Sequence, residues 1–129
     1  MRVVDPGHAY VLAQLDNDDG PYPLIAPVGL FFVKREGEKY PGNVGSYPGT
    51  TMQEVFRALI DRCNYLDAQN PCMETKAVKQ FCESSIIILE QRAARMHGRT
   101  LNMSFDDVLE APICDTCGHV GCTEHVGGV

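Results

Sequence analysis

The chain has 129 residues, of which 44% are hydrophobic and 22% charged. This is the composition of one globular domain and excludes a disordered tail or a fibrous repeat. The apolar runs are far shorter than the roughly 20 residues that cross a bilayer, and Met1 to Gly7 lacks the apolar core of a secretory signal. We therefore expect a soluble cytoplasmic protein with no membrane partner.

The net charge of -6 is unevenly distributed along the chain. Residues 1–30 hold one basic residue against four acidic ones, residues 31–99 hold ten against eight, and residues 100–129 hold none against five. Long nucleic acids favour a continuous basic face, because such a face releases many counterions. This distribution argues against a long nucleic-acid partner. The basic middle is suited to a small phosphorylated ligand.

The N-terminal part is predicted to form a short β-ribbon. Residues 8–15 alternate loosely and end in the turn signal Asp16-Asn-Asp-Asp-Gly20. Three prolines make residues 21–27 extended but unsuited to a central strand, and residues 29–35 are rich enough in aromatic and branched side chains for a second strand. The two strands would pair antiparallel, and a ribbon of this size needs further support.

A glycine-rich connector, residues 36–51, follows the ribbon and contains Tyr-Pro-Gly at 40–42 and at 47–49. Each Pro-Gly pair suits the two central positions of a type II turn. Because entropic linkers rarely contain tyrosine and lysine, this loop is the first candidate for function. The alternative is that the rings of Tyr40 and Tyr47 pack on the ribbon.

Two amphipathic helices are predicted next. Thr51-Met-Gln-Glu54 is a capping box, and the helix that it starts runs to about Gln69, where Asn70-Pro71 stops it. Its apolar stripe comprises Met52, Val55, Phe56, Leu59, Ile60, Cys63 and Leu66. The second helix runs from about Cys72 to His97, ends at Gly98, and has a stripe of Ala77, Val78, Phe81, Cys82, Ser85, Leu89, Ala93 and Met96.

The short connection predicts that these helices pack as an antiparallel hairpin. Residues 86–89, Ile-Ile-Ile-Leu, are apolar around the whole circumference of the second helix. One partner helix cannot cover every side of this segment, so the ribbon or another subunit must cover the rest. We favour another subunit and expect a homo-oligomer, from dimer to hexamer. Further on, Ser104 to Asp107 is a capping signature for a short helix that Pro112 ends.

Together these elements predict an α+β protein in three segments. Residues 1–50 form the ribbon and the glycine- and proline-rich loop, residues 51–98 the helical hairpin, and residues 99–129 a short helix and a Cys/His tail.

The tail reads Cys114-Asp-Thr-Cys117-Gly-His119-Val-Gly-Cys122-Thr-Glu-His125. Cysteine and histidine at such close spacing, with glycines that permit tight bends, indicate a structural zinc site. We take Cys114, Cys117, Cys122 and His125 as the ligands, with His119 as the substitute. A redox or disulfide pair and unliganded thiols are the alternatives. A catalytic metal is not expected, because no acid stands where its general base would be.

The other three cysteines are spread along the hairpin. Cys63 and Cys82 fall on the apolar stripes and are interpreted as small core residues. Cys72 lies at the helix turn with no histidine near it in the sequence, which argues against a nucleophile. No motif of a hydrolase, metalloprotease or nucleotide-binding enzyme is present. We therefore expect a protein that is not an enzyme.

Basic residues and aromatic residues do occur together. A helix N-terminus attracts phosphate, arginine adds paired hydrogen bonds, and tyrosine stacks on a base. A solvated basic face is the alternative for the arginines of the second helix. The candidate ligand-binding residues are Lys34, Arg35, Tyr40, Tyr47, Thr50, Thr51, Arg57, Arg92 and Arg95.

Residues 46–97 resemble the hairpin domain of phage anti-CBASS and Thoeris anti-defence sponge proteins. The resemblance rests on Ser46-Tyr-Pro-Gly49, on Asn70-Pro-Cys-Met-Glu-Thr75 at the start of the second helix, and on Leu89-Glu-Gln-Arg-Ala-Ala-Arg95 near its end. It implies a bacteriophage oligomer in the host cytoplasm that sequesters a cyclic oligonucleotide or a cyclic ADP-ribose isomer without cleaving it. Tyr47 matches the family's base-stacking aromatic, and Arg57 falls near its first-helix basic residue.

Two other functions stay open. A zinc-containing adaptor would use the tail to contact a protein, because the tail has no Lys or Arg for phosphate. A nuclease or phosphodiesterase would act on the same signal and turn it over.

Overall fold

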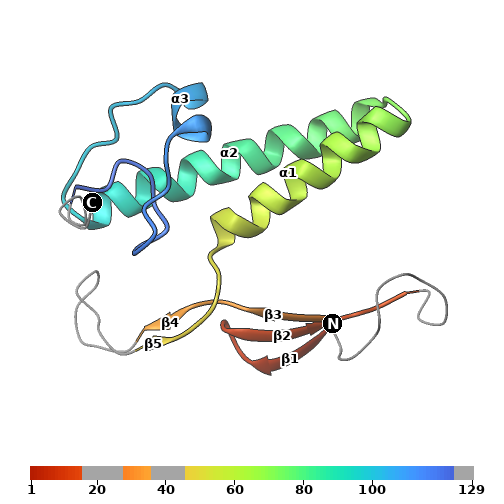
Figure 1. Ribbon diagram of the computed structural model, residues 1–129, viewed down its shortest axis with the longest axis horizontal. Coiled ribbons are helices and arrows are strands. Elements are labelled where there is room, and N and C mark those ends of the chain that lie inside the picture. Colours follow the sequence, from red (N-terminus) through yellow and green to blue (C-terminus); the bar gives the residue numbers. More distant parts are fainter. Residues whose placement is uncertain (16–27, 36–45, 124–129) are drawn as a thin grey trace. The chain divides into compact units, whose positions relative to one another are not determined.

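The computed structural model describes residues 1–15, 28–35 and 46–123 (Figure 1). The chain forms two compact units, Met1–Thr51 and Met52–Val129. The first unit contains strands, and the second contains a helical hairpin followed by a short helix and a cysteine-bearing loop. The predicted α+β class is confirmed.

The first unit contains a three-stranded antiparallel sheet in the order β1 (Arg2–Asp5), β2 (Ala9–Leu12) and β3 (Val28–Phe31). The predicted antiparallel pairing of the second and third strands is confirmed. The sequence prediction missed β1, which gives the ribbon the third strand that it needs. The tight connection from β1 to β2 uses Gly7, whose φ of 82° is unfavourable for other residues.

A second antiparallel pair joins β4 (Lys34–Arg35) to β5 (Ser46–Tyr47), with Lys34 opposite Tyr47. The type II turn predicted at Pro48-Gly49 is wrong, because that turn needs a positive φ that Gly49 does not have. Glycine is required here for another reason: a Cβ atom would lie 2.4 Å from the carbonyl carbon of Phe32. The other Tyr-Pro-Gly, at 40–42, lies outside the described residues.

The helical hairpin consists of α1 (Met52–Gln69) and α2 (Met73–Met96), which pack against each other (Figure 1). Asp67 holds the turn between them: its carboxylate accepts from the Cys72 N–H at 3.2 Å and from Lys76 Nζ at 3.0 Å. These bonds, led by that of Lys76, lower the pKa of Asp67. The predicted stop of α2 at Gly98 is confirmed, with a φ of 69°.

The C-terminal segment covers one side of α2 (Figure 1). Buried Ile87 packs with Val108 and Val120 in a small apolar core. Val108 comes from α3 (Phe105–Glu110), which starts as predicted at Ser104, whose hydroxyl accepts from the Asp107 N–H. The expectation that the ribbon or another subunit must cover residues 86–89 is therefore wrong for Ile87, because the chain folds back over that side.

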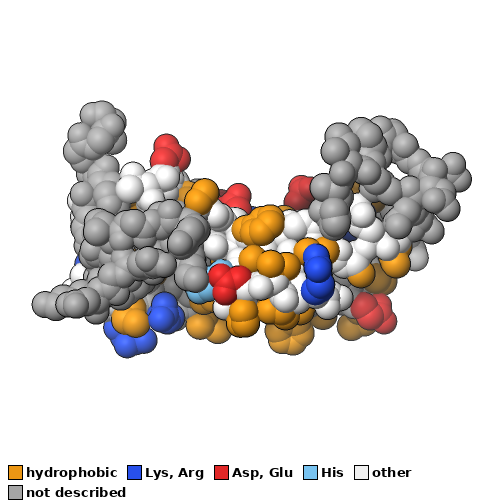
Figure 2. Space-filling model, turned by 90° about the horizontal axis from the view of Figure 1, so that it is seen from below, with side chains coloured by type: hydrophobic (Ala, Val, Ile, Leu, Met, Phe, Trp, Pro, Cys, Tyr) orange, Lys and Arg blue, Asp and Glu red, His pale blue; other side chains and the backbone are white. Residues whose placement is uncertain are grey.

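The apolar stripe predicted for α2 is displaced by about one position. The buried residues of α2 are Cys82, Ile86, Ile87, Glu90, Ala93 and Ala94. Phe81, a member of the predicted stripe, is 73% exposed, and Ile88 is 62% exposed. Met52 and Leu59 of α1 are also exposed, and Figure 2 shows hydrophobic side chains at the surface of the described part of the molecule. The displacement arises because α2 packs on two sides, against α1 and against the C-terminal segment.

Two further expectations for this unit concern the thiols and the membrane. Cys63 and Cys82 are buried, as predicted for small core residues, and burial raises the pKa of Cys82. Among the described residues, the structure contains no helix that is long and apolar enough to span a membrane.

Candidate metal centre and an adjacent buried polar cluster

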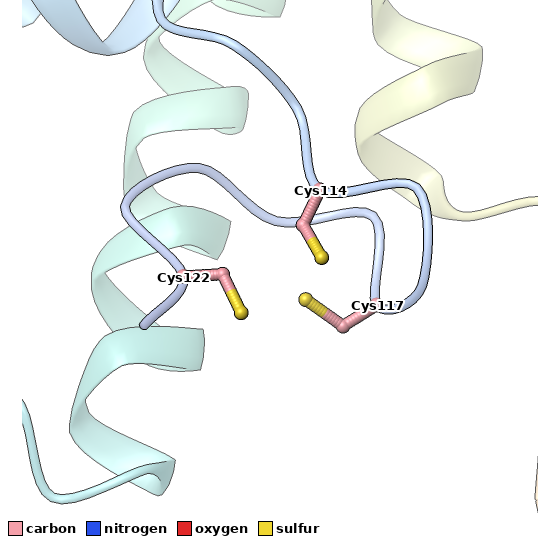
Figure 3. A group of neighbouring side chains, drawn as sticks. All are labelled: Cys114, Cys117 and Cys122. Carbon is pink, nitrogen blue, oxygen red and sulfur yellow. The ribbon is translucent and has the colours of Figure 1, made fainter. Parts of the chain in front are cut away.

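Three cysteines of the C-terminal loop form one compact group. The Sγ atoms of Cys114, Cys117 and Cys122 all lie within 4.8 Å of one another, and Figure 3 shows them pointing into the same space. None of the three forms a disulfide; Cys117 is buried and the other two are half-buried. Three soft ligands in this arrangement suit zinc or a related metal ion. We call this group the cysteine triad.

The fold of the loop follows from local backbone contacts. The Cys114 N–H donates to the His119 carbonyl at 3.0 Å, and the Gly118 N–H donates to the Cys114 carbonyl at 2.8 Å. Gly118 and Gly121 have φ values of 77° and 65°, so they make the bends that bring the third cysteine back to the first two. The role predicted for these glycines is confirmed.

Two of the three thiols have perturbed acidities. The N–H groups of Cys117 and Thr116 stabilise the Cys114 thiolate and lower the pKa of Cys114 to about 6. Burial raises the pKa of Cys117 to about 12. Cys114 is thus mostly ionised at neutral pH, and a bound cation would favour ionisation of its neighbours. The triad has one thiolate ready for a metal ion.

The structure describes only one of the two histidines predicted for this site. His125 lies outside the described residues, so its role as the fourth ligand stays a prediction. His119 does not join the group of candidate ligands found among the described residues. Its Nδ1 lies 3.2 Å from Gln53 Nε2 and 3.6 Å from Glu90 Oε2. The structure thus places His119 against α1 and α2 and does not bring it into the cysteine triad, so its role as the substitute ligand also stays a prediction.

A buried polar cluster, comprising Gln53, Arg57, Glu90 and His119, lies where the loop meets both helices. The side chain of Glu90 is completely buried. Its Oε2 accepts from the Val120 N–H at 3.1 Å, and its Oε1 accepts from Gln53 Nε2 at 3.4 Å. Arg57 Nη2 lies 3.8 Å from Oε1. Burial of a carboxylate is tolerable only with such partners.

Gln53 links the loop to α2, because its Nε2 lies 3.2 Å from Nδ1 of His119 and 3.4 Å from Oε1 of Glu90. Arg57 also donates to Glu54 at 3.0 Å. Its guanidinium thus lies between two carboxylates, which compensate its charge.

Sequence reasoning missed this cluster, although α2 carries a signal for it. Glu90 stands at the helical spacing of Ile86, Ile87, Ala93 and Ala94, all of which are buried. A charged residue at an otherwise apolar position of a helical stripe indicates a buried polar interaction. Nothing in the spacing identifies its partners, which come from α1 and from the loop.

The predicted nucleotide-binding residues are distributed over both units. Lys34 and Tyr47 are opposite each other in the β4–β5 pair, next to Arg35. Thr50 is half-buried and its backbone bonds to Phe31 and Val33. Thr51 ends the first unit, Arg57 belongs to the polar cluster, and Arg92 and Arg95 are exposed on α2. Tyr40 lies outside the described residues. The structure thus places Lys34 and Tyr47 at opposite positions of one strand pair in the first unit.

In comparisons with protein-family models, curated proteins and solved structures, no match was found. The resemblance of residues 46–97 to the anti-defence hairpin domain therefore rests on their sequence alone.

Proposed function

We propose that this protein is a phage anti-defence sponge that binds a cyclic oligonucleotide or a cyclic ADP-ribose isomer and releases it unchanged. The observation that carries the proposal is the register of β4 and β5. In this register Lys34 stands opposite Tyr47. Lysine is a residue type that binds phosphate, and tyrosine is one that stacks on a base. We propose Arg35 and Thr50 as further phosphate-binding residues.

The proposal is tested by sequestration. Purified protein is incubated with cyclic dinucleotides, cyclic trinucleotides and cyclic ADP-ribose isomers, and free ligand is measured before and after heat denaturation. Depletion followed by intact recovery is expected for a sponge. Recovery of a cleaved product would indicate a nuclease or phosphodiesterase instead. No depletion by any member of the panel would contradict the proposal and favour a zinc-containing adaptor that binds a protein.

The Tyr47→Ala variant tests the position of the site. Loss of base stacking costs about 1–3 kcal/mol, so we expect the Kd to rise about 5- to 150-fold with the oligomeric state unchanged. The matched control is Tyr65→Ala, since Tyr65 is an exposed tyrosine on α1. An unchanged Kd for Tyr47→Ala would remove this residue from the site.

We also propose that a second copy of the chain packs on the exposed face of α2. Glu74, Phe81, Ile88 and Arg95 follow one another at intervals of seven residues, so they share one face of the helix. All four are exposed. Antiparallel pairing about a twofold axis near Ser84 and Ser85 brings each Phe81 to Ile88 of the other copy and each Glu74 to the other Arg95. This charge complementarity favours a second copy over an unrelated partner.

For the cysteine triad, we propose a structural zinc ion with His125 as its fourth ligand. The three cysteines supply the Zn–S bonds of a Cys3His site. We expect His125→Ala to bind zinc at least tenfold more weakly than the His8→Gln control, measured by competition with a chromogenic chelator. Equal zinc affinities would exclude His125 as a ligand.

A further inference from the structure

The segment between the second and third cysteines makes the contacts that attach the loop to the hairpin. The Val120 N–H donates to buried Glu90, and the Val120 side chain packs in the core with Ile87 and Val108. His119 meets Gln53 of α1, and the Arg99 guanidinium donates to the Gly121 carbonyl. Residues 119–121 thus belong to the segment that connects Cys117 to Cys122, and they also make the contacts of the loop with α1 and α2.

The loop is held by local contacts rather than by a helix or a sheet. Within residues 113–122, these contacts include the backbone bonds of Cys114 and Gly118, the bridge between Ile113 and Val120, and the N–H groups of Cys117 and Thr116 at the Cys114 thiol. The cysteines of the loop form no disulfide. Ordering an irregular segment costs conformational entropy at every residue, and metal binding supplies folding free energy to loops of this kind.

The hydrogen bonding of Glu90, which is part of the hairpin, depends on the position of the loop. Its carboxylate is completely buried, and the Val120 N–H is its shortest hydrogen bond, at 3.1 Å. If the loop departed, Glu90 would lose this donor and the nearby His119 together. The loop is therefore energetically linked to the side chain that joins α2 to Gln53 and Arg57 of α1.

We propose that a zinc ion in the cysteine triad acts as the clip that closes residues 119–121 over Glu90, so that metal binding and the buried polar cluster are thermodynamically coupled. Linkage then requires the reverse effect as well: the intact cluster must strengthen metal binding. The inference rests on the proposed zinc site but involves no nucleotide, so it can fail or succeed separately from the proposed binding of a cyclic nucleotide.

The first test uses the reduced wild-type protein loaded with zinc. Amide hydrogen exchange is followed at Val120 and at Cys82, before and after zinc removal with a chelator. We expect the Val120 amide to lose at least tenfold in protection while the Cys82 amide, inside α2, stays protected. Unchanged protection at Val120 after verified zinc loss would overturn the proposal, as would a protein that retains no zinc after purification under reducing conditions.

The second test measures the reverse direction of the coupling. Glu90→Gln keeps the shape of the side chain but removes its charge, and zinc affinity is measured by competition with a chelator. Disruption of the groups that support a metal site weakens metal binding 10- to 100-fold, so we expect a loss of about tenfold. The matched control is Glu83→Gln on the same helix, which should bind zinc like wild type. Equal zinc affinity for Glu90→Gln would also overturn the proposal.

Discussion

Two neighbouring isoleucines of α2 give a sharp test of how the C-terminal segment packs. Ile87 is 5% exposed and packs with Val108 and Val120, whereas Ile88 is 62% exposed. Ile87→Ala removes three carbon atoms from this core, which at about 0.8 kcal/mol per buried CH2 group is about 2.4 kcal/mol. A residual cavity raises the cost, so we expect a loss of about 2–4 kcal/mol in the free energy of unfolding.

The same change at Ile88 should cost less than about 0.5 kcal/mol, because that side chain is mostly in water. Both variants are unfolded in urea in the presence of zinc, and circular dichroism at the helix band reports the loss of α1 and α2. The protein concentration is kept low enough that self-association does not contribute. Equal destabilisation by the two substitutions, or a larger effect at Ile88, would refute the packing of the C-terminal segment on α2.

Three more perturbations test other parts of the account. The lowered pKa of Asp67 means that its ionised form stabilises the fold above the unfolded-state pKa and that this contribution disappears as the pH falls through the folded-state pKa. The excess stability of wild type over Asp67→Asn, from urea midpoints, should therefore begin to fall near about pH 4 and vanish at lower pH, and a pH-independent difference would contradict it. In metal-free protein, Cys114 should be alkylated well before Cys117 at pH 7, with a rate half-maximal near its pKa of about 6, and zinc should protect both thiols; equal rates by peptide mass spectrometry would contradict the assigned acidities. Glu74→Arg should dissociate the proposed dimer in sedimentation analysis and Glu74→Arg/Arg95→Glu should restore it, whereas dissociation of the double variant would exclude this pairing.

The helical hairpin could be predicted almost completely because its signals are local. The spacing of apolar residues and the Asn70-Pro71 and Gly98 breaks set the ends of α1 and α2 to within one residue. The buried face of α2 could not be predicted as well, because an all-apolar segment such as residues 86–89 does not tell which neighbour covers which side. The sequence did not predict β1, because Arg2–Asp5 is short and its apolar and polar residues do not alternate.

The candidate site also has a part that local sequence signals predict and a part that they do not. Cys114, Cys117 and Cys122 were predicted from their spacing, since the glycines between them bend a short chain in only a few ways. The partners of His119 lie 66 residues away at Gln53 and on another helix at Glu90. Such contacts depend on tertiary packing, and a single sequence carries no direct signal for them.

Native mass spectrometry of the intact protein, in the presence of zinc and of the ligand depleted in the sequestration assay, tests the central claim most directly. It counts chains, metal ions and nucleotides in the same particle. We expect an assembly with an even number of chains, one zinc ion per chain, and nucleotide of unaltered mass that Tyr47→Ala no longer retains. A single chain without zinc or nucleotide, under conditions that preserve other complexes of similar size, would contradict it.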